Sequence, residues 1–243
     1  MDAEQVGTTA RLLSVVSYNI HQCVGSDRRR DATRIAAILK ELDADIIGLQ
    51  EVHSAHDGTF EAYQMRYLAE TTGYHVVSGP NVTKTNSEYG NVLLTRHSVV
   101  RVNRLDLSVP GREARGAIDA DIAIGDRVVR VIVSHLGLGA RERRYQTKRL
   151  LGLLAQEKAS PIIALLDINE WFPLGAPILR FNEEFGRAPC FRSFPSFFPL
   201  FSLDRVWVKP CAALITVEPY ITPITRVASD HLPLVAKIDP DRF

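Results

Sequence analysis

The chain has 243 residues, of which 46% are hydrophobic and 23% are charged. This is the composition of a globular protein, and it excludes a disordered chain, a collagen and a disulfide-stapled miniprotein. The 29 Lys and Arg residues are nearly balanced by 28 Asp and Glu residues, so the basic excess typical of a nonspecific nucleic-acid coat is absent. The three cysteines are too scattered for a disulfide framework or a zinc motif.

The N-terminal residues and the even composition indicate one soluble unit. Residues 1–11 lack the positive and apolar regions of a secretory signal, and no apolar run reaches the length of a membrane span. We therefore expect a soluble, cytoplasmic protein. No Pro/Gly/Ser-rich linker or break in composition divides the sequence. We expect a flexible N-terminus over residues 1–10 and a single domain over residues 11–243.

The first half of the chain alternates apolar runs with helical periodicity. A β-branched run predicts a buried strand over 12–18, and apolar spacing predicts a helix over 31–42 with Asp31 as its N-cap. The further elements expected in this half are a strand over 45–49, a helix over 60–72 that ends at Gly73, strands near 74–78, 90–95 and 98–107, and an antiparallel pair over 117–124 and 127–134.

The second half continues the same alternation. The longest helical pattern spans 140–156. Its apolar side consists of Tyr145, Leu150, Leu153 and Leu154. Further strands are expected over 161–166, 204–208, 212–218 and 232–238. Phenylalanines and prolines over 194–199 indicate an apolar loop rather than a regular element.

Polar side chains stand where several of these apolar strands begin or end. They are Asn19, Glu51, His135, Asp167, Asn169, Asp204, Asp230 and His231. A carboxylate at the end of a buried strand is costly unless it is paired, hydrogen-bonded or bound to a metal. The set contains carboxylates and amides but no cysteine, which suits Mg²⁺ or Mn²⁺ better than zinc. Because two histidines add acid–base or phosphate-binding capacity, the set predicts hydrolysis of a phosphate ester.

Short motifs in a fixed order span residues 17–234. They are SYNIH at 17–21, GLQEV at 48–52, YGNVLLTR at 89–96, RGA at 115–117, SHL at 134–136, LDIN at 166–169, LDRVWV at 203–208 and SDHLPL at 229–234. Together they resemble the endonuclease/exonuclease/phosphatase (DNase I-like) superfamily, and the stretches around SHL and LDIN are similar to its bacterial metal-dependent hydrolase branch. The resemblance implies an α/β fold, a four-layered sandwich in which helices flank two packed, mixed β-sheets.

The resemblance also implies roles for the polar residues. Glu51 resembles the principal metal carboxylate, with Asn19 and Asp230 as further ligands of Mg²⁺ or Mn²⁺. Asp167 resembles the residue that orients or deprotonates the attacking water, and Asn169 holds the phosphate or that aspartate. The remaining catalytic residues implied by the resemblance are His231, which faces the phosphate, Asp204, which supports it, and His135.

Three further positions bear on the substrate. Arg115 and Asn91 match substrate contacts of the family, with a solvated hairpin arginine and a structural amide as the alternatives. Leu166 stands where the family usually has glycine, which we expect to add bulk beside the site.

The substrate class stays open between two main hypotheses. We expect a Mg²⁺-dependent phosphodiesterase that acts on a phospholipid or another small diester, with a DNase-like endonuclease cutting DNA or RNA as the alternative. A phosphomonoesterase or a non-catalytic binding module is less favoured, since Glu51, Asp167 and His231 are all present. The phenylalanines at 194, 197 and 198 either contact a lipid tail or a membrane surface, or fill the core. No obligate protein partner is evident.

Overall fold

The computed structural model describes residues 11–56, 58–155 and 161–243. The flexible N-terminus expected over 1–10, and the last residue of the helix expected over 140–156, lie outside these residues. Within the described ranges, no helix combines the length and the apolar character needed to cross a membrane.

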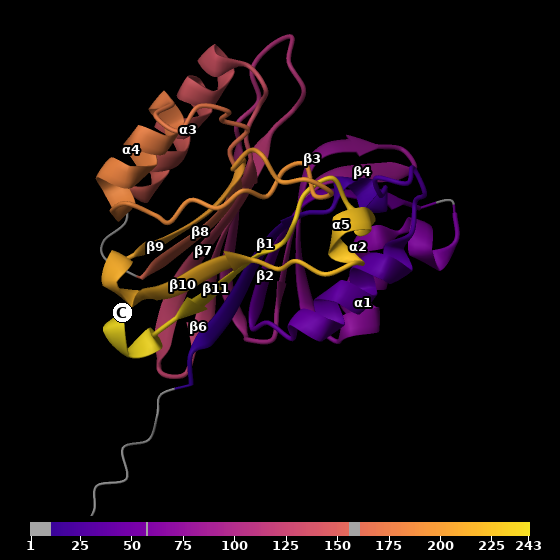
Figure 1. Ribbon diagram of the computed structural model, residues 1–243, viewed down its shortest axis with the longest axis horizontal. Coiled ribbons are helices and arrows are strands. Elements are labelled where there is room, and N and C mark those ends of the chain that lie inside the picture. The colour runs from indigo at the N-terminus through magenta and orange to yellow at the C-terminus, as the bar shows by residue number, and fades with distance from the viewer. Residues whose placement is uncertain (1–10, 57, 156–160) are drawn as a thin grey trace, which may run out of the picture.

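Two mixed β-sheets form the centre of the molecule (Figure 1). The first has the order β10-β11-β1-β2-β4-β3. Its strands are β1 (Leu13–Asn19), β2 (Ile46–Ala55), β3 (His75–Lys84), β4 (Ser87–Thr95), β10 (Leu214–Pro219) and β11 (Leu234–Ile238). The second has the order β5-β6-β7-β8-β9. Its strands are β5 (Val99–Asp106), β6 (Gly116–Ile124), β7 (Arg127–His135), β8 (Ile162–Asp167) and β9 (Asp204–Lys209). Among the described strands, β1–β2 and β7–β8 pair in parallel, and the expected antiparallel pair β6–β7 is confirmed.

Helices cover the outer faces of both sheets (Figure 1). The first sheet is covered by α1 (Ala32–Leu42) and α2 (Gln64–Thr72). The second sheet is covered by α3 (Ala140–Leu154) and α4 (Ala176–Phe185). A short helix, α5 (Thr225–Ala228), lies between β10 and β11 in the sequence. The expected four-layered α/β sandwich is therefore confirmed.

Alternating side chains connect these layers. In β1, Val15 lies in the core between the two sheets, whereas Val16 packs in the core under α1 and α2. In β8, Leu165 lies between the sheets and Leu166 packs beneath α3 and α4. Because successive strand residues point to opposite faces, a strand buried on both sides must be apolar throughout. This requirement explains the uninterrupted apolar runs of the sequence.

The two sheets approach each other closely at Gly48. A Cβ atom added there would lie 2.9 Å from Cδ1 of Leu165 and 3.1 Å from Cγ2 of Val133. These distances leave no ordinary van der Waals space for a side chain. Gly48 therefore lets β2 lie against β7 and β8. As a result, polar residues of these three strands lie in the same region.

Three elements differ from the expectations. Helix α4 was not anticipated, because Gly175 and Pro177 at its start are typical of a loop, although both also suit a helix N-terminus. Helix α5 is only four residues long and leaves no periodic pattern. In α3, Leu150 and Leu154 are buried as expected, but Tyr145 is 44% exposed, so its placement on the apolar side was wrong. The guanidinium of Arg149 covers the Tyr145 ring instead.

The core beneath α3 and α4 gives a stability test. Leu166 is fully buried there, so Leu166→Ala removes apolar contacts and leaves a cavity. We expect this variant to lower the free energy of unfolding by about 2–5 kcal/mol. The matched control Leu12→Ala truncates a side chain that is 39% exposed, and we expect a change of about 0.5 kcal/mol or less. Urea denaturation followed by circular dichroism measures both, and equal losses would contradict the buried position of Leu166.

Candidate active site

Polar residues of the second sheet form one row across the ends of three neighbouring strands. His135 pairs with Asp167 in the register of β7 and β8, and Asp167 pairs with Asp204 in the register of β8 and β9. Val133 and Leu165, two residues before His135 and Asp167, lie in the core between the sheets. Since side chains alternate along a strand, the polar side chains point into the same space. Apolar strands thus place three titratable groups side by side between the sheets.

Glu51 reaches this space through an irregularity in β2. Gln50 already points toward the second sheet, where its Nε2 donates to a backbone carbonyl of β8, so simple alternation would direct Glu51 the other way. However, the pairing of β2 with β4 shifts between Leu49 and Val52, and Glu51 has a φ of 57°. A bulge of this kind re-aims a side chain. It brings Glu51 Oε1 to 3.9 Å from Nδ1 of His135.

The Asn19 side chain joins the two sheets at this point. Its Nδ2 donates to Oδ2 of Asp167 at 2.9 Å and to Oε1 of Glu51 at 3.1 Å. Its Oδ1 accepts from the backbone N–H of His21 at 3.0 Å, which fixes the direction of the amide. In this orientation Asn19 presents N–H groups, and not its oxygen, to the carboxylates. In this structure Asn19 therefore positions Asp167 and Glu51, and its role as a metal ligand stays a prediction.

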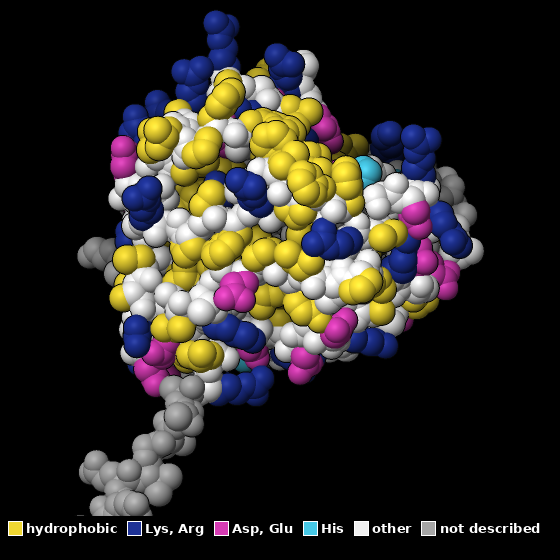
Figure 2. Space-filling model, in the orientation of Figure 1, with side chains coloured by type: hydrophobic (Ala, Val, Ile, Leu, Met, Phe, Trp, Pro, Cys, Tyr) yellow, Lys and Arg dark blue, Asp and Glu magenta, His cyan; other side chains and the backbone are white. Residues whose placement is uncertain are grey.

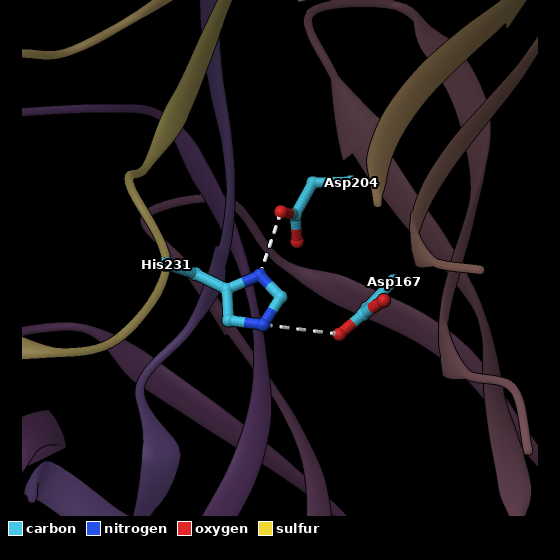
Figure 3. A group of neighbouring side chains, drawn as sticks. All are labelled: Asp167, Asp204 and His231. Atoms are coloured by element: carbon cyan, nitrogen blue, oxygen red, sulfur yellow. Dashed lines mark hydrogen bonds and ion pairs between the residues drawn. The ribbon is translucent and has the colours of Figure 1, made fainter. Parts of the chain in front are cut away.

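Asp204 and His231 form a buried pair beside Asp167 (Figure 3). Nδ1 of His231 donates to Oδ2 of Asp204 at 2.8 Å, and Nε2 of His231 lies 3.8 Å from Oδ2 of Asp167. The same Asp204 oxygen accepts a short hydrogen bond from the Ser193 hydroxyl. His231 therefore stands between two carboxylates, with Nε2 directed toward the space that Asp167 faces.

Asn169 determines the tautomer of the second histidine, His135. Its Nδ2 lies 2.8 Å from Nε2 of His135 and donates to the carbonyl of Leu136 at 2.8 Å, so the two amide hydrogens serve these two acceptors. His135 Nε2 must then accept, which leaves the proton on Nδ1 of a neutral imidazole. The backbone N–H of Asn169 donates to Oδ1 of Asp167 at 3.0 Å. Asn169 thus holds both His135 and Asp167 in place.

The two histidines have opposite pKa shifts. Burial lowers the pKa of His135 to about 3, and the nearby Arg115 charge acts in the same direction. Burial also opposes the charge on His231, but the carboxylates of Asp204 and Asp167 outweigh it and raise that pKa to about 10. Burial raises the pKa of Asp167, although the two histidines counteract it. The site therefore contains one neutral and one cationic imidazole on either side of a carboxyl group, which is a pattern of acid–base sites.

The donor atoms of the site suit a hard metal ion. Asp167, Asp204 and His231 each offer one ligand atom, and these atoms lie within 4.8 Å of one another, so this group could hold a metal ion. In that group, Nδ1 of His231 and Oδ2 of Asp204 are already hydrogen-bonded to each other. The carboxylates that solvent reaches are Glu51 and Asp230, whose side chains are 18% and 36% exposed. Oxygen donors of this kind bind hard divalent cations.

The two predicted substrate contacts are buried beside the row. Arg115 is 4% exposed and pairs through both terminal nitrogens with Glu113, at 3.2 and 3.0 Å. Its Nε is buried and has no hydrogen-bond partner among the described residues. Asn91 donates to the carbonyl of Gly116 at 2.9 Å, while its Oδ1 is likewise unpartnered within the described part of the chain. Both roles stay predictions, and Arg115 is not a solvated hairpin residue.

Aromatic rings line one side of the site. The Phe194 ring lies 4.9 Å from the ring of His231. Trp171 packs edge-on against Phe194 and Phe201, with centroid distances of 5.8 and 4.7 Å, and is itself 41% exposed. The site thus has an apolar wall that reaches from His231 to the surface.

Comparison with known proteins places this geometry in a family. The sequence pattern described as the Endonuclease/Exonuclease/phosphatase family matches residues 16–231. The chain belongs to this family. It is 30% identical over 244 residues to the uncharacterized protein YbhP of Escherichia coli (strain K12), a match that covers 92% of this chain and 95% of YbhP.

Several solved structures share the fold. An endonuclease/exonuclease/phosphatase from Bacteroides vulgatus is similar with a TM-score of 0.76 at 18% identity, over 94% of this chain and 99% of that one. One from Beutenbergia cavernae DSM 12333 gives 0.72 at 21% identity, over 94% and 72% of the two chains. The catalytic domain of human Nocturnin with bound sulfate gives 0.70 at 20% identity, over 93% and 92%. The expected superfamily and fold are confirmed.

Two serines of the site were missed in the sequence. Ser193 donates to Asp204, and the Ser229 hydroxyl donates to the carbonyl of Asn19 at 2.8 Å and lies 3.3 Å from the backbone N–H of His231. Ser229 opens the family motif SDHLPL and could have been found there. Ser193 lies in the irregular apolar segment, where no local pattern distinguishes it from a loop residue.

The structure corrects the expectation for Leu166. Its side chain packs beneath α3 and α4, on the face of β8 opposite to Asp167. The replacement of the family's usual glycine therefore adds volume to the outer core, and not beside the site.

The histidine pKa values can be measured directly in the metal-free protein. By nuclear magnetic resonance we expect the His231 ring to stay protonated to about pH 10 and the His135 ring to stay neutral down to about pH 3. Because the pKa of His231 is raised above its usual 6.5, its contribution to stability is complete below that pH and is lost as the pH rises through 10. His135 acts oppositely, since its lowered pKa costs stability as the pH falls below 6.5. His135→Gln and His231→Gln assign the signals, and two rings that both titrate near 6.5 would contradict the geometry.

Proposed function

We propose that this chain is a Mg²⁺-dependent phosphodiesterase that cleaves its substrate by metal-assisted attack of water. The observation that carries the proposal is the environment of Oδ2 of Asp167. This oxygen accepts from Asn19 at 2.9 Å and lies 3.4 Å from His135 and 3.8 Å from His231. A carboxylate that is held in place beside one neutral and one cationic imidazole is suited to accept a proton next to an anionic group.

In this proposal Asp167 accepts the proton of the attacking water at Oδ2. Its raised pKa favours that transfer, and Asn19 and Asn169 keep the carboxylate oriented. The water oxygen forms a bond to phosphorus as the ester P–O bond breaks. The leaving alkoxide takes a proton from solvent and Asp167 returns its proton to solvent, which leaves a phosphate monoester and an alcohol. His135, neutral and held by Asn169, flanks the water without adding charge.

His231 stabilises the negative charge that develops on the phosphate. Its Nδ1–H is committed to Asp204, so Nε2–H is free to donate to a phosphate oxygen. Asp204 keeps the imidazolium in one orientation, because a paired and hydrogen-bonded ring cannot turn away. Ser193 holds Asp204 in turn. Arg115 is paired with Glu113, but its Nε has no hydrogen-bond partner among the described residues, so this N–H is a second donor for a phosphate oxygen.

Glu51 would hold the metal ion, with Asp230 as a further ligand. Mg²⁺ is the cation that this set of oxygen donors fits, and Mn²⁺ has the same preferences. When bound, the ion supplies positive charge against the phosphate oxygens and the leaving oxygen.

The charge of the site favours a diester over a monoester. The one cationic imidazole, His231, stands against the carboxyl groups of Glu51, Asp167, Asp204 and Asp230, and the charge of Arg115 is already neutralised by Glu113. A diester brings one negative charge and a monoester about two, so the diester meets less repulsion. The apolar wall of Phe194 and Trp171 also suits an alkyl or aryl ester group.

Asp167→Asn tests the proposed base. With Mg²⁺ and bis(p-nitrophenyl) phosphate as a generic diester, we expect kcat to fall by about 10²–10⁴-fold, because the amide cannot accept the proton of water. Asp126→Asn is the matched control, since this aspartate is exposed in the turn between β6 and β7, at their other end. Thermal unfolding shows whether both variants are folded. Undiminished turnover in folded Asp167→Asn would contradict the role.

The choice of substrate class is tested on the same preparations. We expect faster turnover of the diester than of p-nitrophenyl phosphate. Mg²⁺-dependent nicking of supercoiled plasmid that His231→Ala abolishes, together with no cleavage of small diesters, would favour the DNase-like endonuclease instead. Preference for the monoester would contradict the charge argument.

Glu51→Gln tests the metal site. Loss of one carboxylate charge weakens the binding of a hard cation. We therefore expect the Mg²⁺ concentration that gives half-maximal activity to rise by at least about tenfold. The chelator EDTA should abolish activity in the native protein, and added Mg²⁺ should restore it. An unchanged Mg²⁺ dependence in Glu51→Gln would place the ion elsewhere.

A further inference from the structure

Large apolar side chains are exposed on the loops that surround the candidate active site. The loop after β7 exposes Leu138 (67%), and the loop after β8 exposes Phe172 (72%) and Leu174 (77%). In the segment between α4 and β9, Phe197 and Phe198 are each 63% exposed. We refer to these five residues as the apolar rim. Figure 2 shows hydrophobic side chains gathered on the upper part of one face, where Figure 1 draws the segment between α4 and β9 in orange.

The loops that carry the apolar rim are packed against one another. Arg143 joins the first two, because it donates to the carbonyl of Leu138 at 2.5 Å and to Glu170 at 3.2 Å. Trp171 joins the second to the segment between α4 and β9 through its contacts with Phe194 and Phe201. Single exposed apolar side chains are common, but a contiguous group beside a functional site marks a surface that meets another apolar phase.

The charges around the apolar rim are positive. The sequence from 186 to 203 contains no Asp or Glu, Arg192 lies in this segment, and Arg226 donates to the carbonyl of Phe197 at 2.8 Å. Beside Leu138, a hollow of about 660 Å³ at the start of α3 is lined by Arg112, Arg141 and Arg144. The acidic residue of this hollow, Glu142, is buried and turned inward, toward Gln146 and the N–H of Gly139. Apolar side chains with arginines around them are the pattern of proteins that insert into an anionic lipid interface.

We propose that the apolar rim docks this protein on a membrane of anionic phospholipids. The phenylalanines and leucines enter the boundary between headgroups and acyl chains, and the arginines contact the phosphates. A nucleic acid would use the arginines but would leave the exposed leucines and phenylalanines in water. The docking itself does not depend on the activity of the site.

Docking at this place would bring a phosphate of the membrane surface to the site. The apolar wall runs from the rim to His231, since Trp171 contacts Phe194 and the Phe194 ring lies 4.9 Å from His231. A lipid phosphodiester is then the substrate class that fits both features. This extension rests on the proposed function, whereas the docking does not.

Vesicle cosedimentation tests the docking without any reaction. The probes are vesicles of phosphatidylcholine alone and of phosphatidylcholine with phosphatidylglycerol. We expect the native chain to bind the anionic vesicles and to be released partly by salt. The double variant Phe197→Ser with Phe198→Ser should bind at least about tenfold more weakly, because two exposed aromatic rings no longer enter the interface. A second variant, Phe172→Ser with Leu174→Ser, should show the same loss.

The matched control replaces equally apolar residues on the outer strands. Val100 in β5 and Ile215 in β10 are 60% and 41% exposed, and Val100→Ser with Ile215→Ser should bind as the native chain does. Inorganic phosphate should not displace the protein from vesicles, since a free anion offers no apolar phase. Absence of binding, or equal binding by all variants, would overturn the proposal. Concentration-dependent self-association that Phe197→Ser with Phe198→Ser abolishes, without vesicle binding, would assign the surface to a second copy.

Discussion

The structure depends on one buried carboxyl group, that of Asp167, at the place where the two sheets end together. A carboxyl group without solvent is costly unless hydrogen bonds and opposite charge surround it. Here the amide of Asn19 reaches across from the first sheet, while Asn169, His135 and His231 enclose it from the second sheet and from the chain before β11. Separation of the sheets would break the hydrogen bond from Asn19 to this group. The close packing at Gly48 is therefore also what assembles the site.

The same carboxyl group connects stability to chemistry. Its position between a neutral and a cationic imidazole requires different partners for the two rings, and the structure supplies them as Asn169 for His135 and Asp204 for His231. Family membership places the chain among proteins that are generally metal-dependent phosphoesterases. In this chain an apolar wall adjoins that site, and the exposed apolar side chains of the rim lie on the loops around it.

The features of the site that the sequence predicts are those that follow from the periodicity of its strands. His135 and Asp167 continue the inward-facing series of Val133 and Leu165, so their shared location follows from alternation alone. Glu51 breaks that rule, because a bulge re-aims it, and only its motif indicated a place in the site. The direction of the Asn19 amide, the bond from Ser193 and the inward pairing of Arg115 depend on contacts between distant segments, which no local pattern encodes. The same alternation places the Leu166 side chain on the outer face of β8. The comparison with the family motif instead led to the expectation that it lies beside the site.

The most direct test of this account is to locate the metal by anomalous diffraction from crystals grown with Mn²⁺. The account predicts an anomalous peak against the carboxylate of Glu51, with the hydrogen bond between His231 and Asp204 intact and Asn19 still bound to Asp167. A peak that replaces the bond between His231 and Asp204, with Glu51 unligated, would contradict the roles given to these residues. Diffraction without any bound metal at the joined ends of the two sheets would contradict the metal-dependent mechanism itself.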